Sequence, residues 1–344
     1  MKESSRKQLH LSVLNVVACF SVVVLHVNGI FWSHPSGSAW ISANFLETFF
    51  YWAVPVFFMI SGITLLDYRK RYSTKEYFRK RTERTLIPFL FWSLFALCFQ
   101  VIEHTREPDW NIIHIINNVL NSQYVGAYWF FISLFAVYLS FPVLSAVDNK
   151  DEVYHYGCIL GCIFLCIIPL ACSLLKIQYN NALTPPVVGG YVLYPLVGYR
   201  LNKVVLTKKQ RYLIYFAGII GWAMHFLGTH ILSEGKQAID STFKGYLNLP
   251  CFMHSVAVFV LIKNLNYEKI QSIIPAFQNG ILKLSELTFG VYLIHYYFLI
   301  LLPQWFHINT YSIIYRTVGA VGIFLLCAGI TWIMKKIPIL RRLV

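Results

Sequence analysis

The sequence predicts an all-α, polytopic transmembrane bundle of about ten spanning helices. Of its 344 residues, 57% are hydrophobic and only 13% are charged, so the chain cannot cover itself with polar surface as a water-soluble domain must. The apolar residues fall into runs of about 17 to 25, and each run is long enough to cross a hydrocarbon layer of roughly 30 Å. These runs are apolar on every face, whereas a transmembrane barrel needs short alternating segments.

The predicted spans follow one another with short connections. They cover residues 11–31, 43–66, 86–102, 128–147, 155–175, 186–201, 212–232, 245–263, 284–302 and 311–334. The sixth opens with Pro185 and Pro186. The longest connections have about 20 residues, so we expect residues 1–344 to form a single domain with no separate soluble domain. The first run lacks a small-x-small cleavage site, so we expect it to remain as a span.

The basic residues predict the orientation of the chain. In this arrangement 24 of the 29 lysines and arginines lie on one side, eight of them in residues 67–85. The positive-inside rule therefore places both termini in the cytoplasm. A net charge of +14 would also suit nucleic acid, but the charges are divided among short loops beside membrane lipids. We therefore expect no nucleic-acid partner. The other side holds Arg106, Lys176, Lys236, Lys244 and Arg316.

Polar residues inside a span are costly, so His26 is a candidate functional residue. At 100° per residue, Gln8, Ser12 and Asn15 point within about 40° of His26, and the first span therefore carries a polar stripe that we expect to face the bundle. A hydrogen bond to a neighbouring helix would explain His26, and so would a catalytic or transport role.

A second polar stripe lies on the ninth span. Thr288 and Tyr292 point within about 60° of His295. Bonding between helices accounts for such a stripe. Two histidines in different spans are also typical of a proton path or of an acid and base pair.

The loop 67–85 ends in two arginines close to the third span. Positive-inside topology and anionic lipid account for most of its charge. Arg81 and Arg84 are three residues apart, so their guanidinium groups share a helix face that suits a phosphate. No metal site is expected, because the eight cysteines lie in or at the edges of apolar segments with no CxxC pair and no histidine at ligand spacing.

Several segments, taken in order, resemble the acyltransferase-3 family of integral-membrane acyltransferases. The resemblance covers nearly the whole chain. Its motifs are Ala18 to His26, Val54 to Gly62, Arg81 and Arg84 before Pro88, Tyr128-Trp129-Phe130, Ser285 to His295, and Ile337-Pro338.

The resemblance implies an O-acyltransferase of the bacterial cytoplasmic membrane. Such an enzyme moves an acyl group, usually acetyl, from acetyl-CoA or another acyl-CoA to a hydroxyl of a surface polysaccharide or lipid-linked glycan precursor. His26 matches the family's catalytic histidine. Asn15, Arg81 and Arg84 are the candidates for binding the donor. Asn15 stands where the family usually has a basic residue, eleven positions before the histidine, so either Arg81 and Arg84 provide the missing charge, or the donor or the activity differs.

The remaining candidates for lining the site are neutral or aromatic. They are Ser61, Tyr128, Trp129, Tyr292 and His295. Tyr128 or Tyr292 is a candidate donor to the oxyanion that forms during acyl transfer. A transporter or flippase for a glycan precursor is the alternative function, because many spans and aromatic walls also suit a lipid-linked sugar. A purely structural membrane protein is the third reading.

Overall fold

The computed structural model describes residues 3–33, 36–236 and 238–344, with the side chains of residues 3–8 excluded. Within these ranges the regular structure is entirely helical, as the sequence predicts. The α-helices are α1 (Glu3–Val27), α2 (Gly37–Phe50), α3 (Ala53–Leu65), α4 (Thr74–Arg81), α5 (Ile87–Ile102), α6 (Ile112–Leu120), α7 (Trp129–Ser145), α8 (Lys150–Gly161), α9 (Ile168–Leu174), α10 (Leu193–Lys203), α11 (Lys208–Ser233), α12 (Leu249–Lys263), α13 (Tyr267–Ile273), α14 (Phe277–Phe306) and α15 (Ala320–Lys336).

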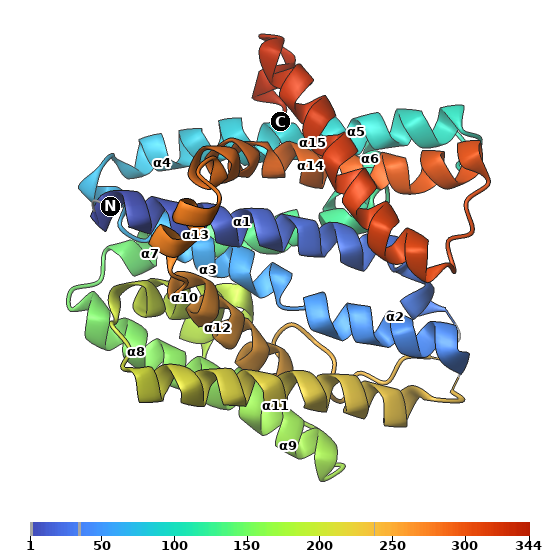
Figure 1. Ribbon diagram of the computed structural model, residues 1–344. Coiled ribbons are helices and arrows are strands. Elements are labelled where there is room, and N and C mark those ends of the chain that lie inside the picture. The colour runs from blue at the N-terminus through green and yellow to red at the C-terminus, as the bar shows by residue number, and fades with distance from the viewer. Residues whose placement is uncertain (1–2, 34–35, 237) are drawn as a thin grey trace.

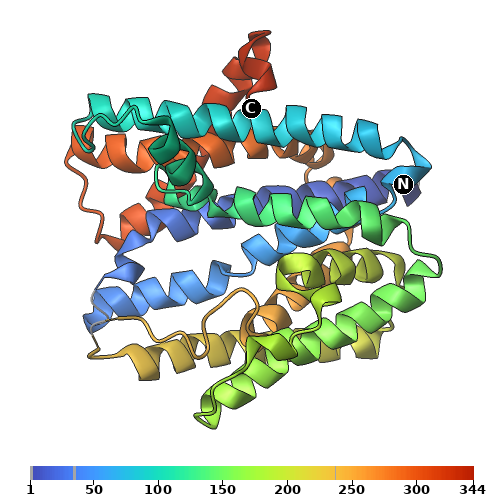
Figure 2. The ribbon, with the colours of Figure 1, turned by 180° about the vertical axis from the view of Figure 1, so that it is seen from behind.

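Helix α1 runs through the middle of the bundle (Figures 1 and 2). In Figure 1, α4, α5 and α14 lie above it, α15 crosses its level on the right, and α2, α3, α10, α11 and α12 lie below it. It packs against α14 and α3, and also against α15, α2 and α12. The first span is therefore surrounded by other helices, which explains how it can carry polar residues without exposing them to lipid.

The lengths and composition of the helices confirm a multi-pass membrane protein. Eight helical segments in the described chain are long and apolar enough to cross a membrane, or nine if α12 and α13, which are bent by 62°, count as one span. The predicted span 186–201 corresponds to α10, which has 11 residues and follows two short 3-10 turns. The total of about ten spans, and the placement of both termini in the cytoplasm, stay predictions.

Prolines account for a break and for two π-helical segments within the spans. Pro55 has no N–H to donate to the carbonyl of Tyr51, and the predicted span 43–66 is broken there into α2 and α3. Pro88 and Pro169 each follow a π-helical segment, η3 (Thr82–Leu86) and η5 (Cys162–Ile167), for the same reason. The first break points Tyr51 into a cavity, and η3 carries Arg84 at the mouth of the third span.

Two glycines bring α3 and α10 into backbone contact. A Cβ on Gly62 would lie 2.2 Å from the carbonyl oxygen of Pro195, and a Cβ on Gly198 would lie 2.5 Å from that of Met59. Any side chain at either position would push the two helices apart. Helix α10 is therefore held against α3 by close packing, as small residues permit in membrane bundles.

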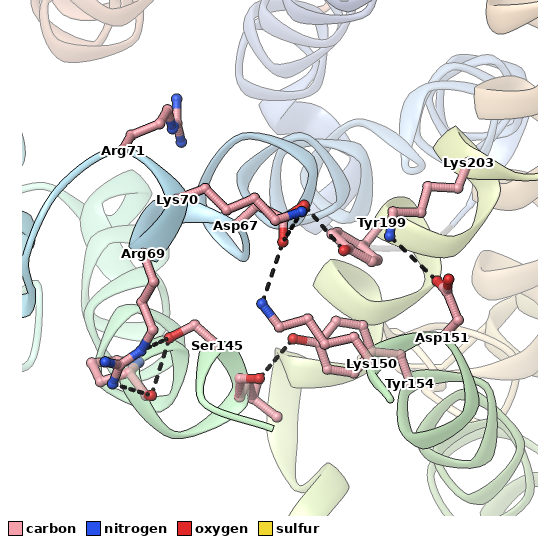
Figure 3. Close-up of polar contacts among 12 residues, drawn as sticks. Asp67, Arg69, Lys70, Arg71, Ser145, Lys150, Asp151, Tyr154, Tyr199 and Lys203 are labelled. Carbon is pink, nitrogen blue, oxygen red and sulfur yellow. Dashed lines mark hydrogen bonds and ion pairs between the residues drawn. The ribbon is translucent and has the colours of Figure 1, made fainter. Parts of the chain in front are cut away.

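The predicted loop 67–85 is mostly helical, because α4 and η3 continue without a break into α5. Polar contacts join α3, α8 and α10 at the face of the bundle where this segment begins. This face, hereafter the basic face, carries Asp67 just after α3 (Figure 3). The Asp67 carboxylate lies 3.3 Å from Lys150 Nζ and accepts a hydrogen bond from the Tyr199 hydroxyl at 3.1 Å. Figure 3 also shows Lys203 directed at Asp151. These pairs join three helices that are far apart in the sequence.

Candidate active site

The two histidines that the sequence singles out meet in the structure. His26 Nδ1 lies 2.8 Å from His295 Nε2, and the rings are stacked with their centroids 4.9 Å apart. His26 comes from the last turn of α1, and His295 from the middle of α14, where its side chain is fully buried. The polar stripe predicted on α1 and the stripe predicted on α14 therefore face each other. The side chain of Gln8 lies outside the described residues.

The hydrogen-bond partners of His295 determine which nitrogens carry protons. His295 Nδ1 lies 2.7 Å from the carbonyl oxygen of Tyr292 and 3.2 Å from that of Val291. A carbonyl only accepts, so Nδ1 of His295 carries the proton, and its Nε2 accepts from His26 Nδ1–H. This leaves the lone pair on His26 Nε2. His295 thus holds His26 in the tautomer that a general base requires.

His26 lines a cavity of about 310 Å³, hereafter the outer cavity. Its wall is mostly aromatic, with the rings of Tyr51 and Tyr246 stacked at 4.1 Å and those of Trp129 and Tyr246 at 5.3 Å. Among the described residues of its lining, Glu47 carries the one carboxylate. A cavity of this size with apolar walls and a few polar groups is typical of a small-molecule site.

A second cavity, of about 320 Å³, lies toward the basic face and is hereafter the inner cavity. It is lined by Asn15, Arg81 and Arg84 among others, and it shares Phe130 and Tyr292 with the outer cavity. The rings of Phe130 and Tyr292 have their centroids 5.8 Å apart. These two side chains therefore form the partition between a cavity that holds the histidine and a cavity that holds the arginines.

The inner cavity meets a wider opening near the C-terminus, of about 1040 Å³, hereafter the mouth cavity. The two share Arg84 and Phe289. The mouth cavity is also lined by Lys335, Arg341 and Arg342, together with the carboxylates of Glu83 and Glu286. Mouth, inner and outer cavities thus follow one another from the basic residues to the histidine pair.

The two arginines and Asn15 take different positions in the inner cavity. The Arg81 guanidinium lies over the rings of Tyr77 and Tyr138 at 6.0 and 5.6 Å, and its Nε is buried with no hydrogen-bond partner in the described chain. Asn15 donates its amide to Thr288 Oγ1 at 2.8 Å and to Ser285 at 3.1 Å. Asn15 therefore joins α1 to α14, and an arginine keeps donor capacity for a ligand.

The other predicted residues divide between the cavities and the packing around them. Trp129 lines the outer cavity and Ser61 the inner cavity, where its hydroxyl donates to the carbonyl of Phe58. Tyr292 lines both, but its hydroxyl proton goes to the carbonyl of Ala127 at 2.5 Å. The Tyr128 hydroxyl donates to the carbonyl of Leu293 at 2.7 Å. As placed, neither tyrosine has its O–H free for an oxyanion, and Tyr128 instead fixes α14 beside His295.

Glu47 and Lys244 form a buried pair beside the outer cavity that was not predicted from the sequence. Their Oε1 and Nζ atoms are 2.8 Å apart, and the side chains are only 3% and 4% exposed. Glu47 lies inside the predicted span 43–66, so the rule that drew attention to the histidines would have found it. Lys244 gave no such signal, because it lies in a connection between spans, where a lysine is ordinary.

Comparisons with known proteins identify one family. A family model described as an acyltransferase domain, that of acyltransferase-3, matches residues 10–332. Neither a curated protein nor a solved structure gives a significant match. Among the described residues no group of three or more histidine, cysteine or acidic side chains is placed to hold a metal ion.

Proposed function

This chain belongs to the acyltransferase-3 family and is a membrane acyltransferase, and from that premise we propose that it is an O-acetyltransferase of the bacterial cytoplasmic membrane. The donor is acetyl-CoA or another acyl-CoA, and the acceptor is a hydroxyl of a surface polysaccharide or of a lipid-linked glycan precursor. The observation that supports this proposal is the row of three cavities, which begins at basic residues and ends at the histidine pair.

The donor enters from the basic face. The phosphates of CoA bind in the mouth cavity, where Arg84, Lys335 and Arg341 provide positive charge. The pantetheine arm extends through the inner cavity past Arg81, whose buried Nε has hydrogen-bonding capacity to spare. Asn15 and His26 are eleven residues apart on one helix, or about 16 Å along its axis, which is comparable to the reach of that arm. The thioester then lies at the partition, next to His26.

The acceptor hydroxyl reacts in the outer cavity. His26 Nε2 takes the hydroxyl proton while the oxygen attacks the thioester carbonyl. The positive charge that forms on His26 is stabilised by its Nδ1–H bond to His295. Collapse of the tetrahedral intermediate breaks the C–S bond, and the departing sulfur takes the proton back from His26. The products are the acyl ester and CoA-SH, and the histidine pair returns to its starting state.

Proteoliposomes that contain the purified protein in one orientation test this proposal. Acetyl-CoA labelled in its acetyl group is supplied on the side of the loop 67–85, and an isolated surface-glycan fraction is supplied on the other. We expect label in the glycan together with an equal amount of free CoA thiol. Movement of a lipid-linked glycan across the membrane without CoA release would instead support a flippase and contradict the proposal.

A further inference from the structure

Glu47, which lines the outer cavity, belongs to a buried ion pair. Glu47 on α2 and Lys244, in the connection between α11 and α12, are joined at 2.8 Å, and both side chains are withdrawn from solvent. The Lys244 ammonium also lies 3.7 Å from the centroid of the Tyr51 ring and 4.6 Å from that of Phe31. The ammonium is thus enclosed by one carboxylate oxygen and by aromatic faces, which fixes the position of the carboxylate.

Only one oxygen of this carboxylate is satisfied by the protein. Lys244 takes Oε1, whereas Oε2 is buried and has no hydrogen-bond partner in the described chain. Buried polar atoms nearly always have a partner, and an ionised oxygen has the strongest need of one. Glu47 lines the same cavity as His26, so a molecule that presents its hydroxyl to His26 is also within the space that Glu47 borders.

The remaining wall favours a ring with apolar faces and hydroxyls on its edge. Tyr51 and Tyr246 stack on each other almost in parallel, at 5° between their planes, and Trp129 continues the aromatic surface at 25° to Tyr246. Such surfaces contact the C–H faces of a ring. A carboxylate oxygen only accepts hydrogen bonds, so it distinguishes a hydroxyl from an ether at the same place.

We propose that Glu47 Oε2 binds a second hydroxyl of the acceptor, next to the one that His26 activates, and so restricts the enzyme to vicinal diols on a ring. Lys244 is a positioning residue that holds the carboxylate. This inference rests on the proposed function, because His26 defines which hydroxyl reacts. A site built to bind a hydroxyl rejects an analogue without it strongly, because the buried oxygen is then left without a partner.

Three small acceptors test the proposal with acetyl-CoA as donor: trans-1,2-cyclohexanediol, cyclohexanol and trans-2-methoxycyclohexanol. We expect the unmodified protein to have a kcat/KM for the diol at least about tenfold above that for either mono-alcohol. The methoxy compound needs no variant and keeps the size of the diol, but its ether oxygen cannot donate to Glu47. Equal use of the diol and the methoxy compound would overturn the proposal while leaving His26-dependent transfer, and so the proposed function, intact.

Two double variants complete the test, and each removes one negative and one positive charge, so the net charge of the protein is unchanged. Glu47→Gln with Lys244→Met removes both buried charges at once, because removal of one would leave the other uncompensated. Asp67→Asn with Lys150→Met does the same to a carboxylate–lysine pair on the basic face (Figure 3). The ratio of kcat/KM for the diol to that for the mono-alcohols should fall below about threefold in the Glu47 and Lys244 variant and remain unchanged in the Asp67 and Lys150 variant. A folded Glu47 and Lys244 variant that keeps the full ratio would contradict a role for Glu47.

A measurement of diol binding tests the role of Glu47 independently of acyl transfer. If no small alcohol is acetylated by the unmodified protein, the glycan assay in proteoliposomes decides on the proposed function, and saturation-transfer NMR with the diol decides on Glu47. Contact of the diol with the unmodified protein in nanodiscs, lost only in the Glu47 and Lys244 variant, supports a diol site. Equal contact in both proteins, or contact in neither, overturns it.

Discussion

The bond between the two histidines predicts a specific loss when His295 is replaced. In His295→Ala, His26 Nδ1 loses the acceptor that lies 2.8 Å away. A neutral hydrogen bond contributes about 1 kcal/mol and one to a charged group about 1.5 to 3, so the pair stabilises the protonated form of His26 by about 0.5 to 2 kcal/mol more than the neutral form. That difference corresponds to a rate about 2 to 30 times lower.

Loss of the tautomer adds to this effect. Without His295, the proton of His26 is free to move to Nε2, which is the nitrogen that has to accept the substrate proton. When another histidine base lost its orienting partner, the rate fell by about 10⁴, which sets an upper bound here. We therefore expect kcat to fall by between about 10-fold and 10⁴-fold, with little change in the KM for acetyl-CoA, because His295 does not line the inner or the mouth cavity.

His295→Gln is the matched control, because its side-chain carbonyl can accept from His26 Nδ1. The assay is release of CoA thiol by nanodisc-embedded protein at saturating acetyl-CoA, with the melting temperature measured on the same samples. We expect the glutamine variant to recover much of the activity that the alanine variant loses. Equal activity of the alanine variant and the unmodified protein would show that His295 does not assist His26. A lower melting temperature with unchanged activity would show that the histidine pair only stabilises the packing of α1 against α14.

Three further predictions concern the donor site, the packing and the orientation. Arg81→Ala together with Arg84→Ala should weaken CoA binding about 10- to 100-fold in a salt-dependent way, as measured by calorimetry at two salt concentrations, and an unchanged affinity would leave the arginines as a topology signal. Gly198→Ala should lower the free energy of unfolding by about 1 to 3 kcal/mol and the melting temperature with it, whereas Gly322→Ala, which has open space around it, should not. Single cysteines placed in the loop 67–85 should react only with membrane-permeant reagents in intact cells, and labelling from outside would reverse the predicted orientation.

The fold class was predictable because lipid offers no hydrogen-bond partners to the backbone. A segment of apolar residues long enough to cross the membrane has to satisfy its own backbone, and a helix does so. The positions of the spans follow from the same rule, and the predicted boundaries agree with α7, α11 and α14 to within several residues. The break between α2 and α3 was not predicted, although Pro55 was visible, because a proline in a span bends it by an amount that its neighbours decide.

The sequence singled out candidate site residues but not how they are arranged. His26 and His295 stand out because an ionisable side chain inside a span is rare. Their contact depends on how α1 and α14 are rotated against each other, and no pattern within either helix determines that rotation. Glu47 was open to the same argument as the histidines. Lys244 was not, because the course of its connection back into the bundle is a property of the tertiary fold.

Replacement of His26 distinguishes a general base of acyl transfer from a structural residue. His26→Ala is compared with the unmodified protein for transfer of labelled acetyl from acetyl-CoA to the glycan acceptor, with CoA affinity and melting temperature measured on the same samples. We expect the affinity and the fold to be nearly unchanged and the transfer rate to fall by about 10² to 10⁴, as general-base loss requires. A folded His26→Ala protein that retains most of its transferase activity would contradict the account.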